Sequence, residues 1–365
     1  MRSRPDFVSG MPIFQALTVN DPATFNNLEL FHIVNGTLEN VTSSLNFSTR
    51  TVCGTVTSLS PFVLFNPTTS TALGSSLNPS TYGQSVTFTA MVTASGGTPT
   101  GTVTFYDGAN ALGTGTLNSS GQATLSTAAL SGGTQTITAV YGGDGKFVAS
   151  TSVGFAQTVN KAYTTSAITA QSANPSVAGQ PVTVSFRVSP VAPGSGTPTG
   201  NVTVSDGSGD SCTGTVAAGG CSLVFPTVGA KTLTASYAGR SNFNSSTSAS
   251  VAHKVTDFSI AVSPTSQTIK AGQKTTYTIT MTPLGGFTGT VALSCGGVPP
   301  SSTCLLSKTS VVFTGSSSAT VYGVLSTSGK TPSATYRLSF TGIYGTGAPA
   351  TGGLTHSANV TLTVQ

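Results

Sequence analysis

Five cysteines are the residues of this 365-residue chain whose spacing points most directly to a chemistry. Cys212 and Cys221 are nine positions apart, as are Cys295 and Cys304, and Cys53 has no counterpart. Neither pair has the CxxC spacing of a zinc site, and no histidine lies near either pair in the sequence. We therefore predict that each pair closes a loop as a disulfide and that Cys53 is a free thiol. Stable disulfides in turn indicate an oxidising, extracellular compartment.

The two loops suit a bridge to different degrees. The segment between Cys295 and Cys304 contains two prolines and joins two expected strands. Between Cys212 and Cys221 the residues AAGG read as a tight turn, and a hairpin closed by that turn does not place the two cysteines opposite each other. This second bridge therefore needs a bulge or a looser loop. Each bridge would be worth roughly 2–3 kcal/mol by the chain-entropy estimate.

Histidines and carboxylates offer little for catalysis. His32, His253 and His356 fall in the N-terminal segment, in a link between domains and in the C-terminal domain, so we do not expect them to meet at one nucleophile. Asp206 and Asp210 in DGSGD form the only close carboxylate pair. Oxygen ligands in one loop leave a calcium ion open as an alternative, whereas Asp before Gly is also ordinary turn chemistry. We predict no catalytic residue, no metal and no cofactor.

The amino-acid composition excludes some fold classes and some function classes. Only 6% of the residues are charged, against about 25% in ordinary globular proteins. The chain has 64 Thr, 51 Ser and two Glu, and Val and Ile are interleaved with the threonines. Such residues suit strands, so a helical fold is excluded. The net charge of +5 is scattered singly, which does not favour nucleic acid, and no stretch approaches the roughly 20 apolar residues of a membrane span.

An internal repeat of about 95 residues organises the chain. NPSTYGQ (78–84) matches NPSVAGQ (174–180), and TPTGTVTFYDG (98–108) matches TPTGNVTVSDG (197–207). A more distant third copy begins with SPTSQTIKAGQ (263–273). The period is far longer than that of a solenoid or a propeller blade, so each copy is expected to be an independent domain.

Within a copy, apolar and polar residues alternate over short runs. In GQSVTFTAMVTA, the residues Val86, Phe88 and Ala90 alternate with hydroxyl-bearing neighbours, which places one set inward and the other toward water. About seven such strands in a copy predict an immunoglobulin-like (Ig-like) β-sandwich. The links at 160–164 and 253–257 are short, so neighbouring domains are expected to follow end to end with little slack.

One position of the repeat indicates whether the copies share a metal site. Asp144, in YGGDGKF of the first copy, has Arg240 as its counterpart in the second copy. A cation in place of a carboxylate argues against a metal site common to the copies. We interpret Asp144 as a turn residue.

The repeat also resembles a known family. NPSTYGQSVTFTAMVTA, TPTGTVTFYDG and GTQTITAVYGGDGKF resemble the bacterial Ig-like domain, group 3. The resemblance covers residues 72–159 closely and residues 163–255 more loosely, and residues 257–365 are similar to Ig-like modules of large secreted and surface proteins of soil bacteria. It implies an all-β fold of tandem Ig-like sandwiches in an extracellular protein, with domains that act as spacers or adhesive modules and no catalytic residues to carry over.

Residues 1–66 differ from the repeats. Strand-like runs at 28–34, 38–42 and 51–56 are followed by the apolar SPFVLF. Three strands do not cover both faces of a sheet. We therefore interpret the segment as a partial β-sandwich, the closing half of a domain whose first half lies upstream. An uncovered apolar face with open strand edges predicts self-association through residues 25–65.

These features predict a non-enzymatic protein of the cell surface or the extracellular space, whose Ig-like repeats serve as a stalk or spacer or in adhesion. Its expected partners are surface or matrix proteins or polysaccharides. Tyr82, Tyr106 and Tyr163 are the candidates for stacking on a sugar, since Trp is absent. Two alternatives stay open: an accessory region of a secreted polysaccharide-degrading enzyme, and a subunit of a self-assembling extracellular filament.

Overall fold

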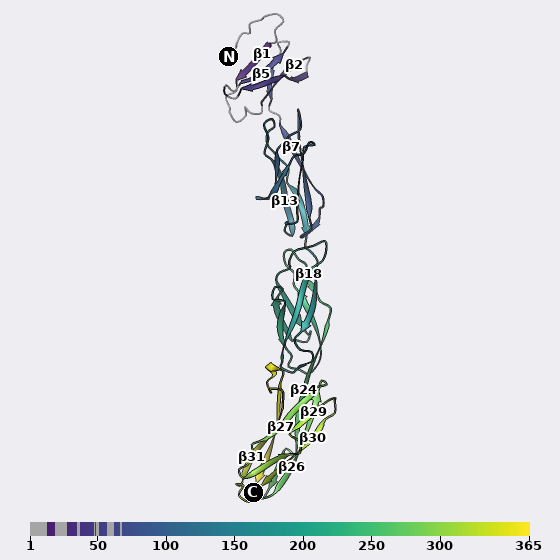
Figure 1. The fold of residues 1–365 in the computed structure, drawn as a ribbon, viewed down its shortest axis with the longest axis vertical. Coiled ribbons are helices and arrows are strands. Elements are labelled where there is room, and N and C mark those ends of the chain that lie inside the picture. The colour runs from purple at the N-terminus through teal and green to yellow at the C-terminus, as the bar shows by residue number, and fades with distance from the viewer. Residues whose placement is uncertain are drawn as a thin grey trace. The chain divides into compact units, whose positions relative to one another are not determined.

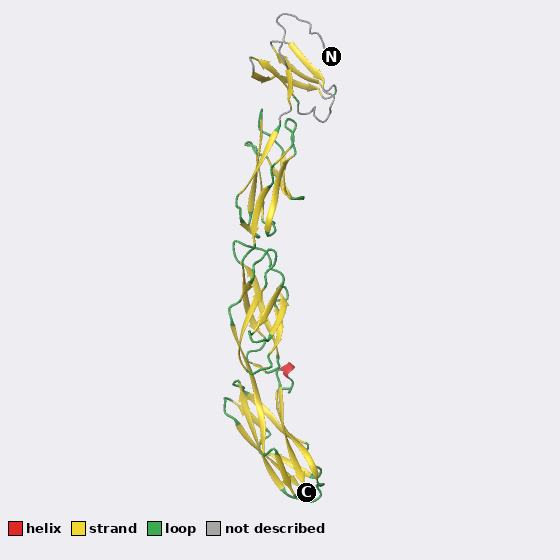
Figure 2. Ribbon diagram, turned by 180° about the vertical axis from the view of Figure 1, so that it is seen from behind, coloured by secondary structure: helices red, strands yellow, loops and turns green. Residues whose placement is uncertain are grey.

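Strands make up most of the chain that the structure describes. The structure is a computed structural model, and the residues that it describes are 13–18, 28–34, 37–46, 48, 51–56, 62–65 and 68–365. Among them the one helical element is the short 3-10 helix η1 (Pro349–Thr351), drawn in red in Figure 2. The predicted all-β fold is confirmed.

The chain divides into two compact units. The first comprises Met1–Ala162 with Ala192–Gly196, and the second comprises Tyr163–Val191 with Thr197–Gln365. In Figure 1 the colour follows the chain through these strands, from purple at the N-terminus to yellow at the C-terminus. Three sandwiches follow the N-terminal segment, and we call them the first (69–160), second (164–255) and third (256–365) sandwich.

The N-terminal segment forms two three-stranded sheets, with strand orders β1-β5-β4 and β3-β2-β6. Leu28, Leu30 and Val52 are buried in its apolar cluster. Six strands are described where the sequence predicted three, because the run 38–42 is broken at Val41 and two further strands pair at the sheet edges. Their bounds are β1 Ile13–Thr18, β2 Glu29–Val34, β3 Thr37–Asn40, β4 Thr42–Asn46, β5 Thr51–Val56 and β6 Phe62–Phe65. The association surface predicted at 25–65 lies partly outside the described residues.

The first sandwich packs a three-stranded sheet, in the order β12-β9-β7, against a sheet in the order β11-β10-β13-β15-β8, with β14 added to β13. The alternation read from the sequence holds, since Val86, Phe88, Ala90 and Val92 are all at most 2% exposed. Its strands are β7 Thr69–Ser75, β8 Ser80–Thr81, β9 Val86–Ala94, β10 Thr102–Asp107, β11 Asn110–Thr116, β12 Gln122–Thr127, β13 Gly133–Tyr141, β14 Ser150–Thr151 and β15 Phe155–Asn160.

The second sandwich repeats this arrangement strand for strand. The order β16-β18-β21 faces the order β20-β19-β22-β24, with β17 added to β24 and β23 to β22. Its strands are β16 Thr164–Gln171, β17 Ser176–Val177, β18 Pro181–Pro190, β19 Asn201–Ser205, β20 Ser211–Thr215, β21 Gly220–Val224, β22 Gly229–Tyr237, β23 Ser246–Thr247 and β24 Val251–Ser263.

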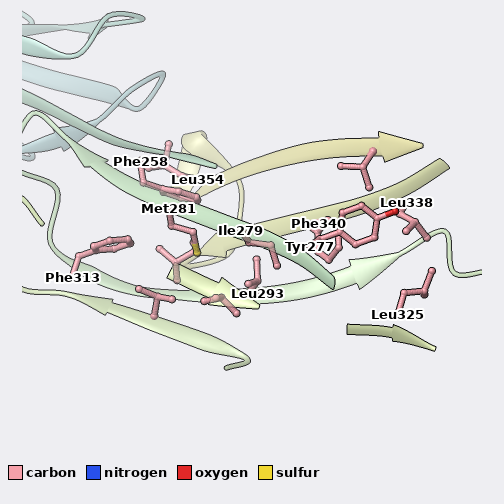
Figure 3. Close-up of a cluster of buried hydrophobic side chains, with 14 of the residues drawn as sticks. Phe258, Tyr277, Ile279, Met281, Leu293, Phe313, Leu325, Leu338, Phe340 and Leu354 are labelled. Carbon is pink, nitrogen blue, oxygen red and sulfur yellow. The ribbon is translucent and has the colours of Figure 1, made fainter. Parts of the chain in front are cut away.

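The third sandwich begins inside β24. One sheet continues as β24-β26-β30-β28, and the other has the order β25-β32-β31-β27-β29. Its core gathers large side chains from both sheets (Figure 3), among them Tyr277 and Phe340, whose ring centroids lie 5.6 Å apart. The remaining strands are β25 Ser266–Ile269, β26 Lys274–Leu284, β27 Gly289–Gly296, β28 Ser302–Leu306, β29 Ser310–Phe313, β30 Ala319–Thr327, β31 Ala334–Tyr344 and β32 Leu354–Val364.

The NPS motif marks the place where the chain crosses from one sheet to the other. In the first sandwich, the side chain of Asn78 accepts from Thr158 N (2.9 Å) and donates to the carbonyl of Ala156 (2.8 Å). Asn174 makes the same pair of bonds to β24, which replaces β15 in the second sandwich. The amide side chain satisfies backbone groups that the short strands β8 and β17 leave uncovered.

The GQ motif closes the next turn in all three sandwiches. The glycine has a positive φ each time, +78° at Gly83, +79° at Gly179 and +84° at Gly272, where a side chain would be strained. The following glutamine then accepts a hydrogen bond from the backbone N–H three residues before it, at 3.0–3.1 Å. This shared turn places the third domain in the same structural repeat as the other two.

Candidate functional site

Cys212 and Cys221 join the two sheets of the second sandwich. Cys212 lies on β20, which pairs with β19, and Cys221 lies on β21, which pairs with β18 in the opposite sheet. Their Cα atoms are 5.9 Å apart. The hairpin register assumed in the sequence analysis is wrong, because the turn after β20 carries the chain across the sandwich instead of back along the same sheet.

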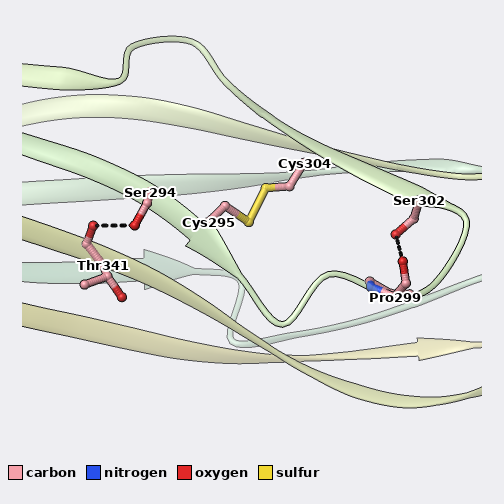
Figure 4. The surroundings of a disulfide bond; sticks show 6 residues. All are labelled: Ser294, Cys295, Pro299, Ser302, Cys304 and Thr341. Atoms are coloured by element: carbon pink, nitrogen blue, oxygen red, sulfur yellow. Dashed lines mark hydrogen bonds between the residues drawn. A yellow bond between two sulfur atoms is a disulfide. The ribbon is translucent and has the colours of Figure 1, made fainter.

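The second bridge has the same architecture in the third sandwich (Figure 4). Cys295 on β27 and Cys304 on β28 belong to opposite sheets, with Cα atoms 6.4 Å apart. The loop between them is held by Ser302, whose hydroxyl donates to the carbonyl of Pro299 at 2.5 Å. Both cysteines are partly buried and pack against the apolar core. Each disulfide therefore ties the two sheets together beside an edge strand.

Cys53 has no disulfide partner among the described residues. It lies half-buried on β5, opposite Ala16 of β1, and its carbonyl accepts from the hydroxyl of Ser43 at 3.0 Å. Its reactivity as a free thiol stays a prediction.

Lys231 bridges the two carboxylates of the loop that carries Asp206 and Asp210. Lys231 Nζ, on β22, lies 2.9 Å from Asp206 Oδ2 and 3.1 Å from Asp210 Oδ2. Asp206 Oδ1 accepts from the backbone N–H groups of Ser208 (2.9 Å) and Asp210 (3.0 Å). The side chain of Asp206 is fully buried. The ammonium group therefore occupies the place between the carboxylates that a cation such as calcium would need.

The charges of this cluster are strengthened by its contacts. Burial acts to raise the pKa of Asp206, but hydrogen bonds from Ser208 and Lys231 outweigh it and hold that pKa below its ordinary value. Hydrogen bonding to Asp206 in turn raises the pKa of Lys231. Both groups are ionised near neutral pH, so the lysine serves as a counter-ion and not as a nucleophile. Across the described residues, no group of three or more His, Cys, Asp and Glu side chains is arranged to hold a metal.

The three histidines have separate surroundings. His32 is buried on β2 in the N-terminal segment. His253 is buried on β24 and contacts Gln171 and Ser176. His356, on β32, lies 2.7 Å from Asp257 through Nε2. His253 and His356 are each bonded within a separate local cluster, and the hydroxyl that His253 contacts, that of Ser176, is itself buried at 1% exposure.

Asp144 is the turn residue that its sequence predicts. Its carboxylate accepts from the backbone N–H groups of Lys146 and Phe147 and from both the N–H and the hydroxyl of Thr100, all at 2.7–2.8 Å. Burial acts to raise the pKa of Asp144, but these hydrogen bonds lower it from 3.8 to about 2. Of the three candidate tyrosines, Tyr163 is 72% exposed, whereas Tyr82 and Tyr106 are half-buried.

A further feature, missed by the sequence reading, is the junction between the second and third sandwiches. The residues expected to form a link lie inside β24, which is 13 residues long. Val255 pairs with β22, Thr256 with β17 and Asp257 with β26, so each step of the passage belongs to a sheet ladder. The last strand of one sandwich is therefore the first strand of the next.

Side chains pack across this junction. Val177, from β17 of the second sandwich, is 7% exposed and belongs to the core cluster of the third. Gly285 approaches the second sandwich so closely that a Cβ at this position would lie 2.5 Å from the carbonyl oxygen of Val255 and 2.6 Å from Val228. Next to these contacts lies a cavity of about 280 Å³, with Gln180 and Tyr344 among its lining residues. No charged side chain lines it.

Two segments of the chain match a known family. Residues 73–160 and 168–256 fit the profile of the family described as Bacterial Ig-like domain (group 3). The chain carries two bacterial Ig-like domains of group 3. These matches coincide with the first and second sandwiches, and the predicted family is confirmed for them. No curated protein matches the sequence.

Solved structures show only distant likeness to the chain. Invasin, a bacterial integrin-binding protein, is 12% identical with a TM-score of 0.40, and the match covers 81% of this chain and 60% of that one. Domains 4 and 5 of the S-layer protein SbsC are 15% identical with a TM-score of 0.21, and the match covers 39% of this chain and 68% of that one. The fibronectin(III)-like modules of Clostridium thermocellum CbhA are 16% identical with a TM-score of 0.22, covering 51% and 93%. With TM-scores this low, these likenesses carry no argument about function.

The described residues include no helix with the length and apolar character of a membrane span.

Proposed function

We propose that this chain is a non-catalytic structural part of an extracellular or cell-surface protein, in which the Ig-like domains act as a stiff spacer or an adhesive module. The family of the first two sandwiches supports this proposal, as do the two inter-sheet disulfides, because such bridges persist in oxidising compartments. The carboxylates considered above have structural contacts, since Asp206 and Asp210 pair with Lys231 and Asp144 closes a turn.

The observation that carries the proposal is the strand shared by two sandwiches. Domains joined by a flexible linker move independently, whereas a ladder that continues from one domain into the next resists bending. Val177 adds buried apolar contact across the same junction. A spacer needs this resistance, because its role is to hold what it carries at a fixed distance.

Interrupting the shared strand tests the proposal. We would insert Gly-Ser-Gly-Ser between Thr256 and Asp257 of the full chain, with fluorophores on non-natural residues at the exposed positions Ala217 and Lys308. The unmodified chain is expected to give one narrow distribution of transfer efficiency in single molecules. The insertion is expected to broaden it, because the ladder through β24 no longer continues.

A matched insertion controls for the added residues. The same four residues between Ser316 and Ser317 lengthen an exposed loop of the third sandwich and are expected to leave the distribution narrow. A distribution in the unmodified chain as broad as that of the Thr256 insertion would contradict the spacer proposal.

We further propose surface or matrix proteins or polysaccharides as the partners, and self-association through the N-terminal segment as one form of contact. The two small sheets of that segment support the second point, because no other strand of the described residues pairs with their outer strands. Sedimentation of the full chain over a hundredfold concentration range tests it. A rising weight-average mass is expected, and a constant monomer mass would contradict it.

A further inference from the structure

A buried histidine lies at the base of the junction. His253 is 2% exposed and stacks on Phe225, with ring centroids 4.5 Å apart. Its Nδ1 lies 2.5 Å from Gln171 Oε1, and its Nε2 lies 2.9 Å from the hydroxyl of Ser176. An amide oxygen only accepts, so Nδ1 carries the proton and Nε2 accepts from Ser176. The amide nitrogen of Gln171 donates to Ala252, which agrees with this assignment.

The partners of His253 also hold the third sandwich in place. The carbonyl of Ser176 accepts from the hydroxyl of Thr256 at 3.1 Å, and the residue after Ser176 is Val177, which packs into the third core. The carbonyl of Phe225 accepts from the N–H of Gly179 at 2.9 Å, in the turn that touches the loop around η1. The contacts of the second sandwich at the junction therefore depend on two residues that rest against the imidazole.

Among the residues that the structure describes, no carboxylate is hydrogen-bonded to this ring. Lys231 is its direct neighbour across β22 and is itself bound by the loop carboxylates. Burial lowers the pKa of His253, so the ring is neutral at pH 7. The charged and titratable groups on the two paired strands are Lys231 and Tyr237 on β22 and Lys254 and Asp257 on β24. Asp206 and Asp210 bind Lys231, and His356 binds Asp257.

We propose that this junction is acid-sensitive: protonation of His253 displaces Ser176 and Phe225 and lets the second and third sandwiches move independently. A proton on Nε2 turns that atom from an acceptor into a donor, so the hydroxyl of Ser176 has to turn and accept, and its own proton is left without its acceptor. The new charge is buried with no carboxylate bonded to it among the described residues. Because the histidine is neutral in the folded state, stability is lost as the pH falls below the ordinary histidine value near 6.5. This acid sensitivity would add a pH response to the proposed spacer, and so it rests on that proposed function. The test below measures local hydrogen exchange of the backbone, which can be read whether or not the chain is a spacer.

The first sandwich provides an internal control in the same molecule. At the position equivalent to His253 it has Gln157, fully buried and bonded to Ser75 and Ser80, which does not titrate. Amide hydrogen exchange of the full chain would be followed by mass spectrometry at pH 7.5 and pH 5.0, with intrinsic rates corrected. Protection of residues 174–182 is expected to fall, by at most about tenfold per pH unit for one proton. Residues 78–86 are expected to keep theirs.

Two variants identify the group that responds. His253→Gln, which supplies the residue of the first sandwich, is expected to abolish the fall at 174–182. His356→Gln removes the other titratable histidine of the junction and is expected to leave the fall unchanged. An equal response of the two segments in the unmodified chain would overturn the proposal without any variant. It is equally overturned if the fall persists in His253→Gln or disappears only in His356→Gln.

Discussion

The first and second sandwiches join their two sheets at equivalent positions, but with different residues. Leu125 and Cys221 occupy equivalent positions, opposite Phe88 and Val184 in the pairing of the inner strands. Gly113 and Cys212 are likewise equivalent, on β11 and β20. A Cβ on Gly113 would lie 2.9 Å from the side chain of Leu125. In the first sandwich the side chain of Leu125 therefore packs against Gly113 between the two sheets. In the second sandwich a disulfide joins the sheets at the equivalent positions.

Other equivalent positions differ in the same way. Gln157 and His253 occupy one buried place, and Asp144 and Arg240 occupy one turn. The backbone arrangement is retained in each case. The Asp144 carboxylate accepts from the N–H of Phe147, whereas in the second sandwich the N–H of Phe243 donates to the backbone carbonyl of Arg240 (3.2 Å), since a guanidinium cannot accept. The two copies therefore share the same strand arrangement and differ in the side chains at these positions. Each copy can serve as a control for the other.

Removal of the second sandwich's disulfide is expected to give the largest effect. Cys212→Ser with Cys221→Ser should lower its opening free energy by about 2–3 kcal/mol, because the closed loop is released in the unfolded state. Cys212→Gly with Cys221→Leu supplies the pair of the first sandwich and should recover about 1 kcal/mol through apolar burial. Hydrogen exchange of residues 220–224 in the full chain measures both.

Alkylation of the intact chain without reductant controls this experiment. One label, on Cys53, is expected, and five labels would show that neither bridge forms. If the Gly/Leu pair is no more stable than the Ser/Ser pair, the two closures are not equivalent.

Removal of the counter-ion Lys231 is expected to give the second-largest loss of stability. Lys231→Gln introduces Gln135, the first sandwich's residue at this position, and leaves Asp206 buried without its cation. We expect a loss of about 1–2 kcal/mol, since water screens part of the pair at the sandwich edge. Because the pKa of Asp206 is depressed, its stabilisation is present above pH 3.8 and is lost as the pH falls below that value. Denaturant unfolding at pH 7 and pH 3 measures the difference.

The exposed Lys308 provides the matched control, since Lys308→Gln removes a lysine that has no ion pair among the described residues. Its stability is expected to stay within about 0.5 kcal/mol of the unmodified chain. An equal loss from both variants at pH 7 would mean that the ion pair contributes nothing specific.

The smallest effect concerns the buried polar position. Gln157→His should transfer acid sensitivity to the first sandwich, because a buried neutral histidine loses its stabilising contribution as the pH drops below about 6.5. We expect about 1 kcal/mol of destabilisation between pH 7.5 and pH 5.5, read from exchange of residues 78–86. An unchanged pH response at 78–86 would show that the two environments differ in more than this side chain.

Local patterns in the sequence predict most of the fold. The alternation around Phe88 and the two NPS copies predict the sandwiches and their repeat, because strand burial has a period of two residues. The link at 253–257 was missed because a strand that changes partner at Thr256 has no distinctive composition. Lys231 was missed because its carboxylates lie in the loop between β19 and β20, 21 and 25 residues away in the sequence. The inter-sheet path of Cys212–Cys221 depends on which sheet each strand joins, which sequence spacing does not specify.

The second and third sandwiches are expected to behave as one unit through β24. Native-state hydrogen exchange of the full chain in increasing denaturant tests it most directly, because cooperative units share one opening free energy and one denaturant slope. The slowest amides of β22 and of β26 are expected to merge into a single isotherm, while those of β13 in the first sandwich follow their own. Separate isotherms for β22 and β26, with the third sandwich opening while the second stays closed, would contradict the claim.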